Sequence, residues 1–222
     1  GSTLGVFGET GSGKSTIAGI LAAKNRGYTG TVTIGGVPLS QVQEAELMKR
    51  VVLVRHNSYL FKGTVEENLK MAKPDATKDE MEAVLRQVNL LGFLQTQNGL
   101  QTQLLEKASN LSGGQCQRLV IARALLKSDS AVYIFDEAAS NIDVESEELI
   151  MKVIHELAKT KTVLLISHRL ANVVQSDRIY FLKDGEIRES GTHEQLMQAN
   201  GAYKNLFDSQ MALERYGTKE VA

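Results

Sequence analysis

The sequence predicts an α/β domain with a largely parallel sheet. The apolar run Leu4–Phe7 leads into a glycine-rich loop, and a helical segment follows from Thr16 to Ala23. Two further runs, Ala131–Phe135 and Thr162–Ile166, are continuously apolar, which is typical of strands buried on both faces. Strands and helical segments alternate along the chain as a whole, and such an alternation usually forms a parallel sheet.

Two more strand signals lie in the first part of the chain. Residues 31–34 and Val37 flank Gly35-Gly36, a pair that favours a tight hairpin. Residues 50–55 contain the apolar run Val51-Val52-Leu53-Val54, which suits another buried strand. We assign residues 1–62 to the first part of the core domain.

The middle of the chain, from about residue 64 to 107, has helical spacing and long polar side chains. Met81, Val84, Leu85 and Val88 share one helical face. We interpret this stretch as a helical insert with its own small core; the alternative is a continuation of the main domain. The expected division is a helical subdomain over residues 63–120 and a second part of the core over residues 121–222.

The last part of the chain contains a helix near residues 119–126, a hairpin and a further helix. Residues 179–187 form the hairpin around Asp184-Gly185, a favoured turn pair. Thr192 and Gln195 have the spacing of a capping box, which predicts the start of a final helix.

Composition excludes several classes of protein. Among 222 residues, 42% are hydrophobic, which fits a globular protein with a sizeable core. The net charge is -1, from 25 basic and 26 acidic residues, so nothing indicates a nucleic-acid partner. Cys116 is the single cysteine, which excludes an internal disulfide and fits a reducing compartment. No apolar run approaches the roughly 18 residues of a membrane span, so we expect the chain alone to be soluble.

The glycine-rich loop has the pattern G-x-x-x-x-G-K-[ST], which is the Walker A motif. Its glycines allow several backbone N–H groups to point into one concavity, and the following helix adds its positive N-terminal dipole. Lys14 supplies a charge for the β- and γ-phosphates, and Ser15 a hydroxyl for Mg²⁺. The alternative is a glycine-rich turn with a chance lysine, but the strand–loop–helix context favours phosphate binding. The residues assigned to the nucleotide are Gly8, Gly11, Ser12, Gly13, Lys14, Ser15 and Thr16.

Two acidic residues follow the apolar run that ends at Phe135. Asp136 stands where a Walker B carboxylate holds Mg²⁺ through water. Glu137 comes directly after it and can orient or deprotonate a water that faces the γ-phosphate. The alternative is a solvated acidic pair at a strand end.

A second candidate phosphate cradle is Leu111-Ser112-Gly113-Gly114-Gln115, which opens a helix. Glycines and a serine at a helix N-terminus suit an anion. One ATP does not need two cradles in one chain. The residues assigned here are Ser112, Gly113, Gly114 and Gln115.

Together these motifs resemble the nucleotide-binding domain of an ABC transporter, over a stretch from Leu4 to about Gln210. LSGGQ is the signature motif of that family. The resemblance implies a P-loop NTPase core with a helical subdomain of the ABC ATPase type. It also implies a head-to-tail pair of such domains, with each ATP between the Walker A motif of one and the signature of the other.

Other motifs match the family residue by residue. Residues 140–143 resemble the D-loop, usually S-A-L-D, which runs along the dimer interface, and this resemblance adds Asp143 to the residues assigned to the nucleotide. His168 resembles the switch histidine that contacts the γ-phosphate; a lone histidine can otherwise be a core or surface residue. Residues 191–196 and 201–203 resemble exporter-type members, in which the domain is fused behind a membrane-spanning half. The implied location is the cytoplasmic face of the cell membrane.

The sequence departs from the family at three places. His56 aligns with the Q-loop glutamine that ligates Mg²⁺, and imidazole is a poorer Mg²⁺ ligand than an amide oxygen. His56 is therefore either a metal ligand or a surface replacement. Residues 102–108 keep Glu106 but lose the glycines of the exporter pattern T-x-V-G-E-R-G. The aromatic residue that stacks on adenine has no candidate here, so we expect these residues to lack the first strands of the family.

The resemblance implies Mg²⁺-dependent ATP hydrolysis that drives export through a transmembrane domain, with Lys14, Glu137 and His168 as catalytic residues. The alternative is an ATP-binding regulatory module with weak hydrolysis, which only the degenerate position His56 supports. A chromosome-maintenance ATPase would carry a long coiled coil between the Q-loop and the signature. Here that gap is 111 − 56 = 55 residues without sustained heptads, which excludes this class.

Overall fold

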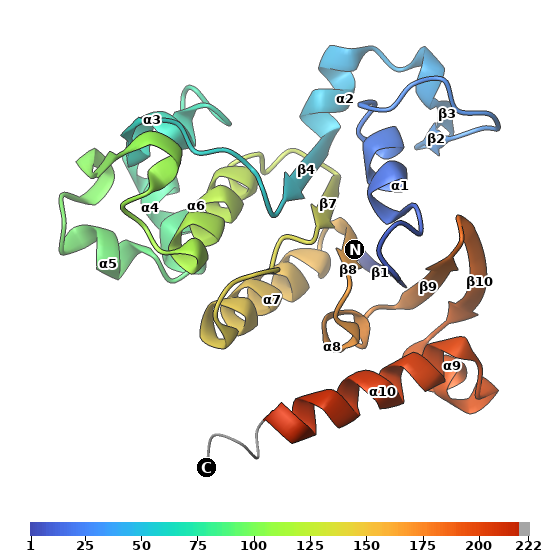
Figure 1. Cartoon of the computed structure of the whole chain (residues 1–222). Helices are drawn as coiled ribbons and strands as arrows, with labels where there is room; N and C mark the ends of the chain where they lie inside the picture. Colours follow the sequence, from blue (N-terminus) through green and yellow to red (C-terminus); the bar gives the residue numbers. More distant parts are fainter. Residues whose placement is uncertain (218–222) are drawn as a thin grey trace.

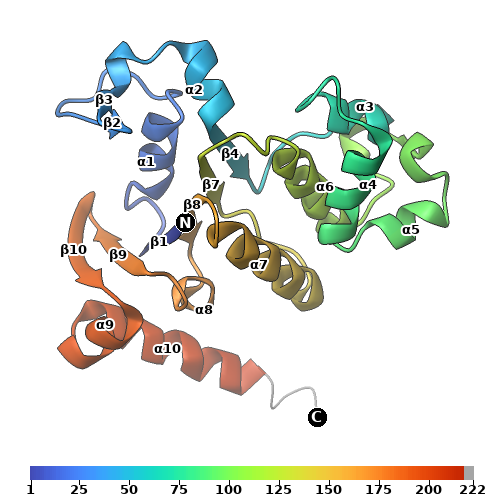
Figure 2. The ribbon, with the colours of Figure 1, turned by 180° about the vertical axis from the view of Figure 1, so that it is seen from behind.

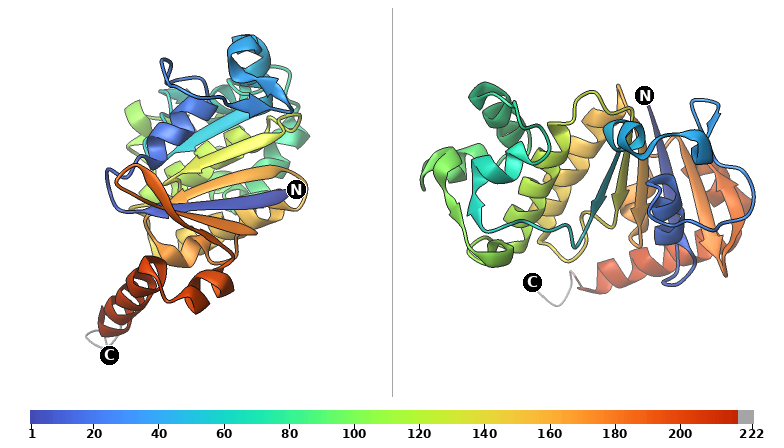
Figure 3. Two further views of the ribbon diagram at one scale, coloured as in Figure 1. Left: turned by 90° about the vertical axis from the view of Figure 1, so that its right-hand side faces the viewer. Right: turned by 90° about the horizontal axis from the view of Figure 1, so that it is seen from above.

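The computed structural model of the chain describes residues 1–217. Its centre is a six-stranded sheet with the strand order β10-β9-β1-β8-β7-β4. Only the β9–β10 pair in this sheet is antiparallel; the other neighbours run parallel. The left panel of Figure 3 shows these strands side by side. The strands are β1 (Ser2–Gly8), β4 (Val51–Arg55), β7 (Val132–Asp136), β8 (Thr162–Ser167), β9 (Arg178–Lys183) and β10 (Glu186–Gly191). The prediction of an α/β fold with a mostly parallel sheet is confirmed.

Helices cover both faces of this sheet (Figure 1). On one face α1 (Lys14–Leu21) and α2 (Glu44–Arg50) pack on alternate strand residues such as Val6, Ile134 and Ile166. On the other face α6 (Gly113–Leu125) and α7 (Val144–Ala158) cover the residues between them, such as Phe7 and Phe135. The sheet is therefore the middle layer of three, and the carboxyl ends of its parallel strands meet at one edge.

The predicted helical insert forms a group of helices at one side of the molecule (Figure 2). It comprises α3 (Val65–Lys70), α4 (Lys78–Gln87), α5 (Leu91–Gln95) and a short pair, β5 (Gly63–Thr64) with β6 (Gln103–Leu104). Thr64 and Thr77 open α3 and α4 with capping boxes, which satisfy N–H groups that the first turn leaves free. The face predicted to be apolar is buried, at Met81, Val84, Leu85 and Val88.

The expectation that the insert has a small core of its own is wrong. Its buried side chains form one continuous apolar cluster with those on the α6–α7 face of the sheet. The physical reason is α6, which packs on α3 and α4 at one side and on β4 and α7 at the other.

The hairpins are confirmed. β2 (Thr33–Ile34) pairs with β3 (Val37–Pro38) across Gly35-Gly36. β9 turns into β10 through Asp184 and Gly185, whose φ angles of 51° and 79° are the positive values that this turn requires.

The C-terminal part differs from the prediction in one respect. Thr192 opens α9 (His193–Ala199) with the predicted capping box, but α9 is not the final helix, because α10 (Ala202–Gly217) follows. The remaining helix is α8 (Leu170–Val173), and 3₁₀ turns occur at Leu39–Gln41, Gly99–Gln101 and Glu106–Ala108. Within residues 1–217, no helix is both long and apolar enough to cross a bilayer.

Candidate active site

The loop between β1 and α1 lies at the carboxyl edge of the sheet, and its conformation depends on glycine. Gly11 and Gly13 have φ angles of 83° and 98°, which side chains rarely adopt. A Cβ atom on Gly8 would lie 2.2 Å from the carbonyl oxygen of Leu182. The backbone can therefore curl tightly in front of the first turn of α1, whose N–H groups have no partners within the helix.

Lys14 folds back over this loop. Its Nζ donates to the carbonyl oxygens of Gly8 and Glu9, at 2.8 Å each. Burial lowers the pKa of Lys14, and the nearby carboxylates of Glu137 and Asp136 oppose that shift. The ammonium group is thus held between the loop and the two predicted acidic residues.

The loop contains one buried polar atom without a partner. Ser12 is 3% exposed, and its Oγ makes no hydrogen bond among the described residues. Buried hydroxyl groups in proteins are nearly always bonded, so an unsatisfied one inside a glycine-rich loop fits an anion such as a phosphate. The residues present therefore fit the ATP phosphates that the motif implies.

Asp136 ends β7, two strands from β1 in the sheet. Ser15 Oγ donates to Asp136 Oδ1 at 3.0 Å, and Arg55 Nε lies 3.5 Å from Oδ2. No cluster of three or more His, Cys, Asp or Glu side chains in the described chain is arranged to hold a metal. A hydroxyl beside a single carboxylate instead fits Mg²⁺, which usually takes few protein ligands and completes its shell with water and substrate phosphates.

Glu137 and His168 lie at the ends of neighbouring strands. His168 Nδ1 is 3.7 Å from Glu137 Oε1, too far for a direct hydrogen bond. The Glu137 backbone has a φ of 53° and donates to the Ile166 carbonyl at 3.0 Å. Strained backbone of this kind concentrates at functional sites. The two side chains are 30% and 47% exposed, so both are open to a ligand in front of the loop.

The backbone of His56 lies next to that of Asp136. Its N–H donates to the Asp136 carbonyl at 3.3 Å, which fixes the segment after β4 against the end of β7. The His56 residue itself is exposed, and in the described part of the chain its ring takes part in no hydrogen bond or ion pair.

The second cradle is built at the start of α6. Ser112 caps the helix, and Ser112 and Gln115 form a reciprocal capping box with bonds of 3.2 Å and 2.9 Å. Gly114 packs against the start of α7, where a Cβ atom would lie 2.2 Å from Ser146 Oγ and 2.8 Å from Asp143 Oδ2. Gly113 has more room, because its nearest neighbours would be 3.9 Å away.

Asp143 caps α7. It accepts from the Ser146 backbone N–H at 2.8 Å, and this bond lowers the pKa of the carboxyl group. The signature and D-loop residues thus touch each other. No hydrogen bond within residues 1–217 joins residues 112–115 to the loop of residues 8–16. The helices that follow the two cradles, α1 and α6, cover opposite faces of the sheet (Figure 1).

Sequence reasoning missed two residues of this region. Arg55 lies beside Asp136, and its position at the carboxyl end of an apolar strand was a usable signal, because such ends meet at one edge of a parallel sheet. Gln210 in α10 forms hydrogen bonds with the backbone of His168 and of Leu170. No local pattern marks a contact between residues so far apart in the chain.

Comparison with known proteins agrees with this geometry. The profile of the ABC transporter family matches residues 1–140. An ABC transporter ATP-binding protein of Haemophilus influenzae is 47% identical over 99% of this chain, and an ATP-dependent lipid A-core flippase of Mannheimia succiniciproducens is 39% identical over 95%. These matches cover 39% and 36% of the two relatives, so the chain spans about two fifths of the length of the curated relatives it matches.

A solved structure of a bacterial Atm1-family ABC exporter with ATP bound matches with a TM-score of 0.88 and 30% identity. The match covers 94% of this chain and 36% of that one. The family profile spans 140 of the 222 residues, and both motif loops of the fold lie within that stretch. The chain therefore belongs to the ABC transporter family, as an ATP-binding domain.

Proposed function

We propose that the chain is the ATP-hydrolysing domain of an ABC exporter, which uses Mg²⁺ and pairs head to tail with a second such domain. The observation that carries this proposal is the arrangement at one glycine-rich loop: Lys14 and Ser15 of the loop lie near Asp136 and Glu137, and His168 lies beside Glu137. The proposed division is a core of residues 1–62 and 121–222, with residues 63–120 as the helical subdomain.

The chain's own groups have distinct roles in the proposed reaction. Lys14 and the N–H groups of the loop bind the phosphates, while Ser15 and Asp136 hold Mg²⁺, which neutralises phosphate charge when bound. Glu137 orients a water molecule and accepts its proton. His168 lies 3.7 Å from Glu137, and its role is to contact the γ-phosphate that the water attacks.

The second cradle supports a shared site. Residues 112–115 form a capped helix N-terminus, and a Cβ atom on Gly113 would meet its nearest neighbours only at 3.9 Å. No hydrogen bond in the described chain connects these residues to the first loop. We infer that Ser112, Gly113, Gly114 and Gln115, with Asp143 beside them, complete the ATP site of a second domain.

The exposed ring of His56, which forms no hydrogen bond in the described chain, favours one alternative function: a domain that binds ATP but hydrolyses it weakly.

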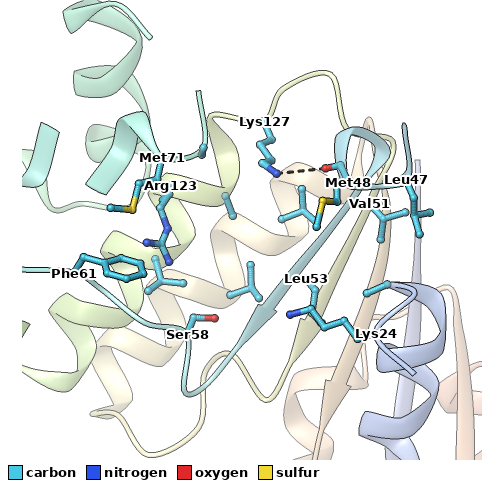
Figure 4. A pocket seen from close by; sticks show the side chains of 16 residues that line it. Lys24, Leu47, Met48, Val51, Leu53, Ser58, Phe61, Met71, Arg123 and Lys127 are labelled. Atoms are coloured by element: carbon cyan, nitrogen blue, oxygen red, sulfur yellow. Dashed lines mark hydrogen bonds between the residues drawn. The ribbon is translucent and has the colours of Figure 1, made fainter. Parts of the chain in front are cut away.

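A groove beside β4 supports a membrane-domain partner (Figure 4). It has a volume of about 380 Å³ and runs along β4 between α2 and α6. Met48, Phe61 and Met71 line it and are 60%, 47% and 53% exposed. Exposed apolar side chains gathered in one groove are typical of an interaction site.

The charged residues of this groove indicate which charge the partner segment carries. Lys24, Arg123 and Lys127 line it, and none of its lining residues is acidic. Arg123 is tied to the loop after β4, where its Nη2 donates to the Tyr59 carbonyl at 2.8 Å. We infer that a membrane-domain segment with an apolar side and at least one carboxylate docks here, and that this contact reaches the His56 loop and the signature helix α6 together.

The proposed hydrolysis is tested with Glu137→Gln, which keeps the shape of the side chain but cannot accept a proton. We expect ATP turnover to fall by about 100-fold or more, a typical contribution of general base catalysis. ATP should still bind, and light scattering should show an ATP-dependent dimer because the closed state no longer resets. Glu145→Gln is the matched control, since Glu145 is an exposed acid in the first turn of α7. Unchanged turnover in Glu137→Gln would remove Glu137 from the mechanism.

A further inference from the structure

The turn that carries His168 is held by a side chain from the far end of the chain. Gln210 Nε2 donates to the His168 carbonyl at 2.9 Å, and Gln210 Oε1 accepts from the Leu170 N–H at 3.0 Å. Both functional atoms of one amide group therefore bridge the turn between β8 and α8. Figures 1 and 2 both show α10 passing beside α8.

The turn has little structure of its own to fix its shape. α8 has only four residues, and the side chain of its N-cap residue Arg169 bonds to Glu147 and does not cap the helix. Ser167 Oγ accepts from the Arg169 N–H at 3.0 Å. Leu170 N–H, the first donor of the helix, finds its acceptor in Gln210, so α10 supplies the missing cap.

A second anchor reaches the same turn from α7. Glu147 is 5% exposed, and it accepts from Arg169 and from Asn172 Nδ2, the latter at 2.8 Å. This anchor holds side chains that follow His168. Among the described residues, Gln210 alone forms a hydrogen bond with the backbone of His168 itself.

α10 is fixed well enough to act as a support. Its N-terminal N–H groups at Ala202 and Tyr203 donate to the Glu189 carboxylate of β10. Tyr203 is fully buried and bonds to His193 Nδ1 at 2.9 Å, which ties α10 to α9. Gln210 therefore extends from a helix whose first turn is anchored to the edge of the sheet.

We propose that Gln210 is a positioning residue for His168. It acts through the backbone and touches neither nucleotide nor metal: its amide sets the carbonyl plane of His168 and thereby the direction of the imidazole toward the γ-phosphate. This inference rests on the proposed ATP hydrolysis. It makes the C-terminal helix α10 part of the catalytic apparatus, because a displacement of α10 would move the histidine.

The test compares three variants in the full chain. Gln210→Leu removes both hydrogen bonds, and Gln210→Glu keeps an acceptor for Leu170 but places a carboxylate against the His168 carbonyl. Asn205→Leu is the control, an exposed amide on the same helix. We expect kcat to fall about tenfold in both Gln210 variants, as small misplacements of catalytic groups do, with KM for ATP changed less than twofold. Asn205→Leu should leave both constants unchanged.

A double-mutant cycle separates positioning from a general loss of structure. In a His168→Ala background, Gln210→Leu should cause no further loss of kcat, because the residue acts only through the histidine. Hydrogen exchange at the Leu170 N–H should become about tenfold faster in Gln210→Leu, at an unchanged unfolding midpoint.

The results distinguish a failure of the proposed hydrolysis from a failure of the proposed role of Gln210. A wild-type chain without turnover contradicts the proposed hydrolysis. In an active chain, an additive loss in the His168→Ala background, or a loss of equal size in Asn205→Leu, overturns the role of Gln210.

Discussion

The close contact between the signature and the D-loop leaves no room for a side chain at Gly114. In Gly114→Ala the new Cβ would lie 2.2 Å from Ser146 Oγ, 2.7 Å from Ser146 Cβ and 2.8 Å from Asp143 Oδ2. Rotation of the Ser146 hydroxyl can relieve the first overlap only, since Ser146 Cβ is fixed to the helix backbone. The start of α6 must then move away from α7. Such overpacking costs about 1–3 kcal/mol of unfolding free energy.

The neighbouring glycine is the matched control. In Gly113→Ala the nearest atoms would be 3.9 Å away, an ordinary contact, so we expect unfolding free energy to stay the same or to rise by a few tenths of a kcal/mol. At about 2–4 °C per kcal/mol for a chain of this size, Gly114→Ala should lower Tm by about 2–12 °C. Both variants are measured by thermal unfolding followed by circular dichroism. Equal Tm values for the two alanine variants would refute the packing argument.

Two further outcomes follow from single side chains. His56→Gln should lower the Mg²⁺ concentration that gives half-maximal ATPase activity, because an amide oxygen suits Mg²⁺ better than imidazole does; identical Mg²⁺ titrations would mean that His56 only faces solvent. Asp143→Ala should lower the urea midpoint of unfolding at pH 7, because α7 loses its cap. The Ser146 N–H lowers the Asp143 pKa in the folded state, so its stabilisation is present above the unfolded value of about 3.9 and is lost as pH falls through the folded value. The difference in midpoint between wild type and Asp143→Ala should therefore close below about pH 4, and a gap that persists there would exclude the carboxylate as its source.

The parts of the fold with strong local signals could be predicted from the sequence. The apolar runs of β1, β7 and β8, the turn pair Asp184-Gly185 and the capping box at Thr192 need no knowledge of distant residues. The same holds for the glycine-rich loop, whose pattern fixes both its conformation and the place of Lys14.

What the sequence left open depends on long-range contacts. The insert shares one core with the sheet because α6 packs in two directions, which helical spacing alone does not reveal. α7 was not predicted, although its buried residues Ile150, Met151 and Ile154 have helical spacing after the N-cap Asp143. The two anchors of the His168 turn, Glu147 and Gln210, come from separate helices, and only the folded chain brings them together.

The central claim, that each ATP site is shared between two domains, is tested by mixing two inactive variants. Lys14→Ala destroys the first cradle of its own chain, and Ser112→Arg destroys the second. A mixed dimer then contains one intact composite site, whereas each homodimer contains none. We predict that ATPase activity, absent in either variant alone, returns on mixing to as much as about half the wild-type rate per mixed dimer, because one of its two composite sites is intact. No recovery of activity in dimers shown to contain both chains would contradict the shared site.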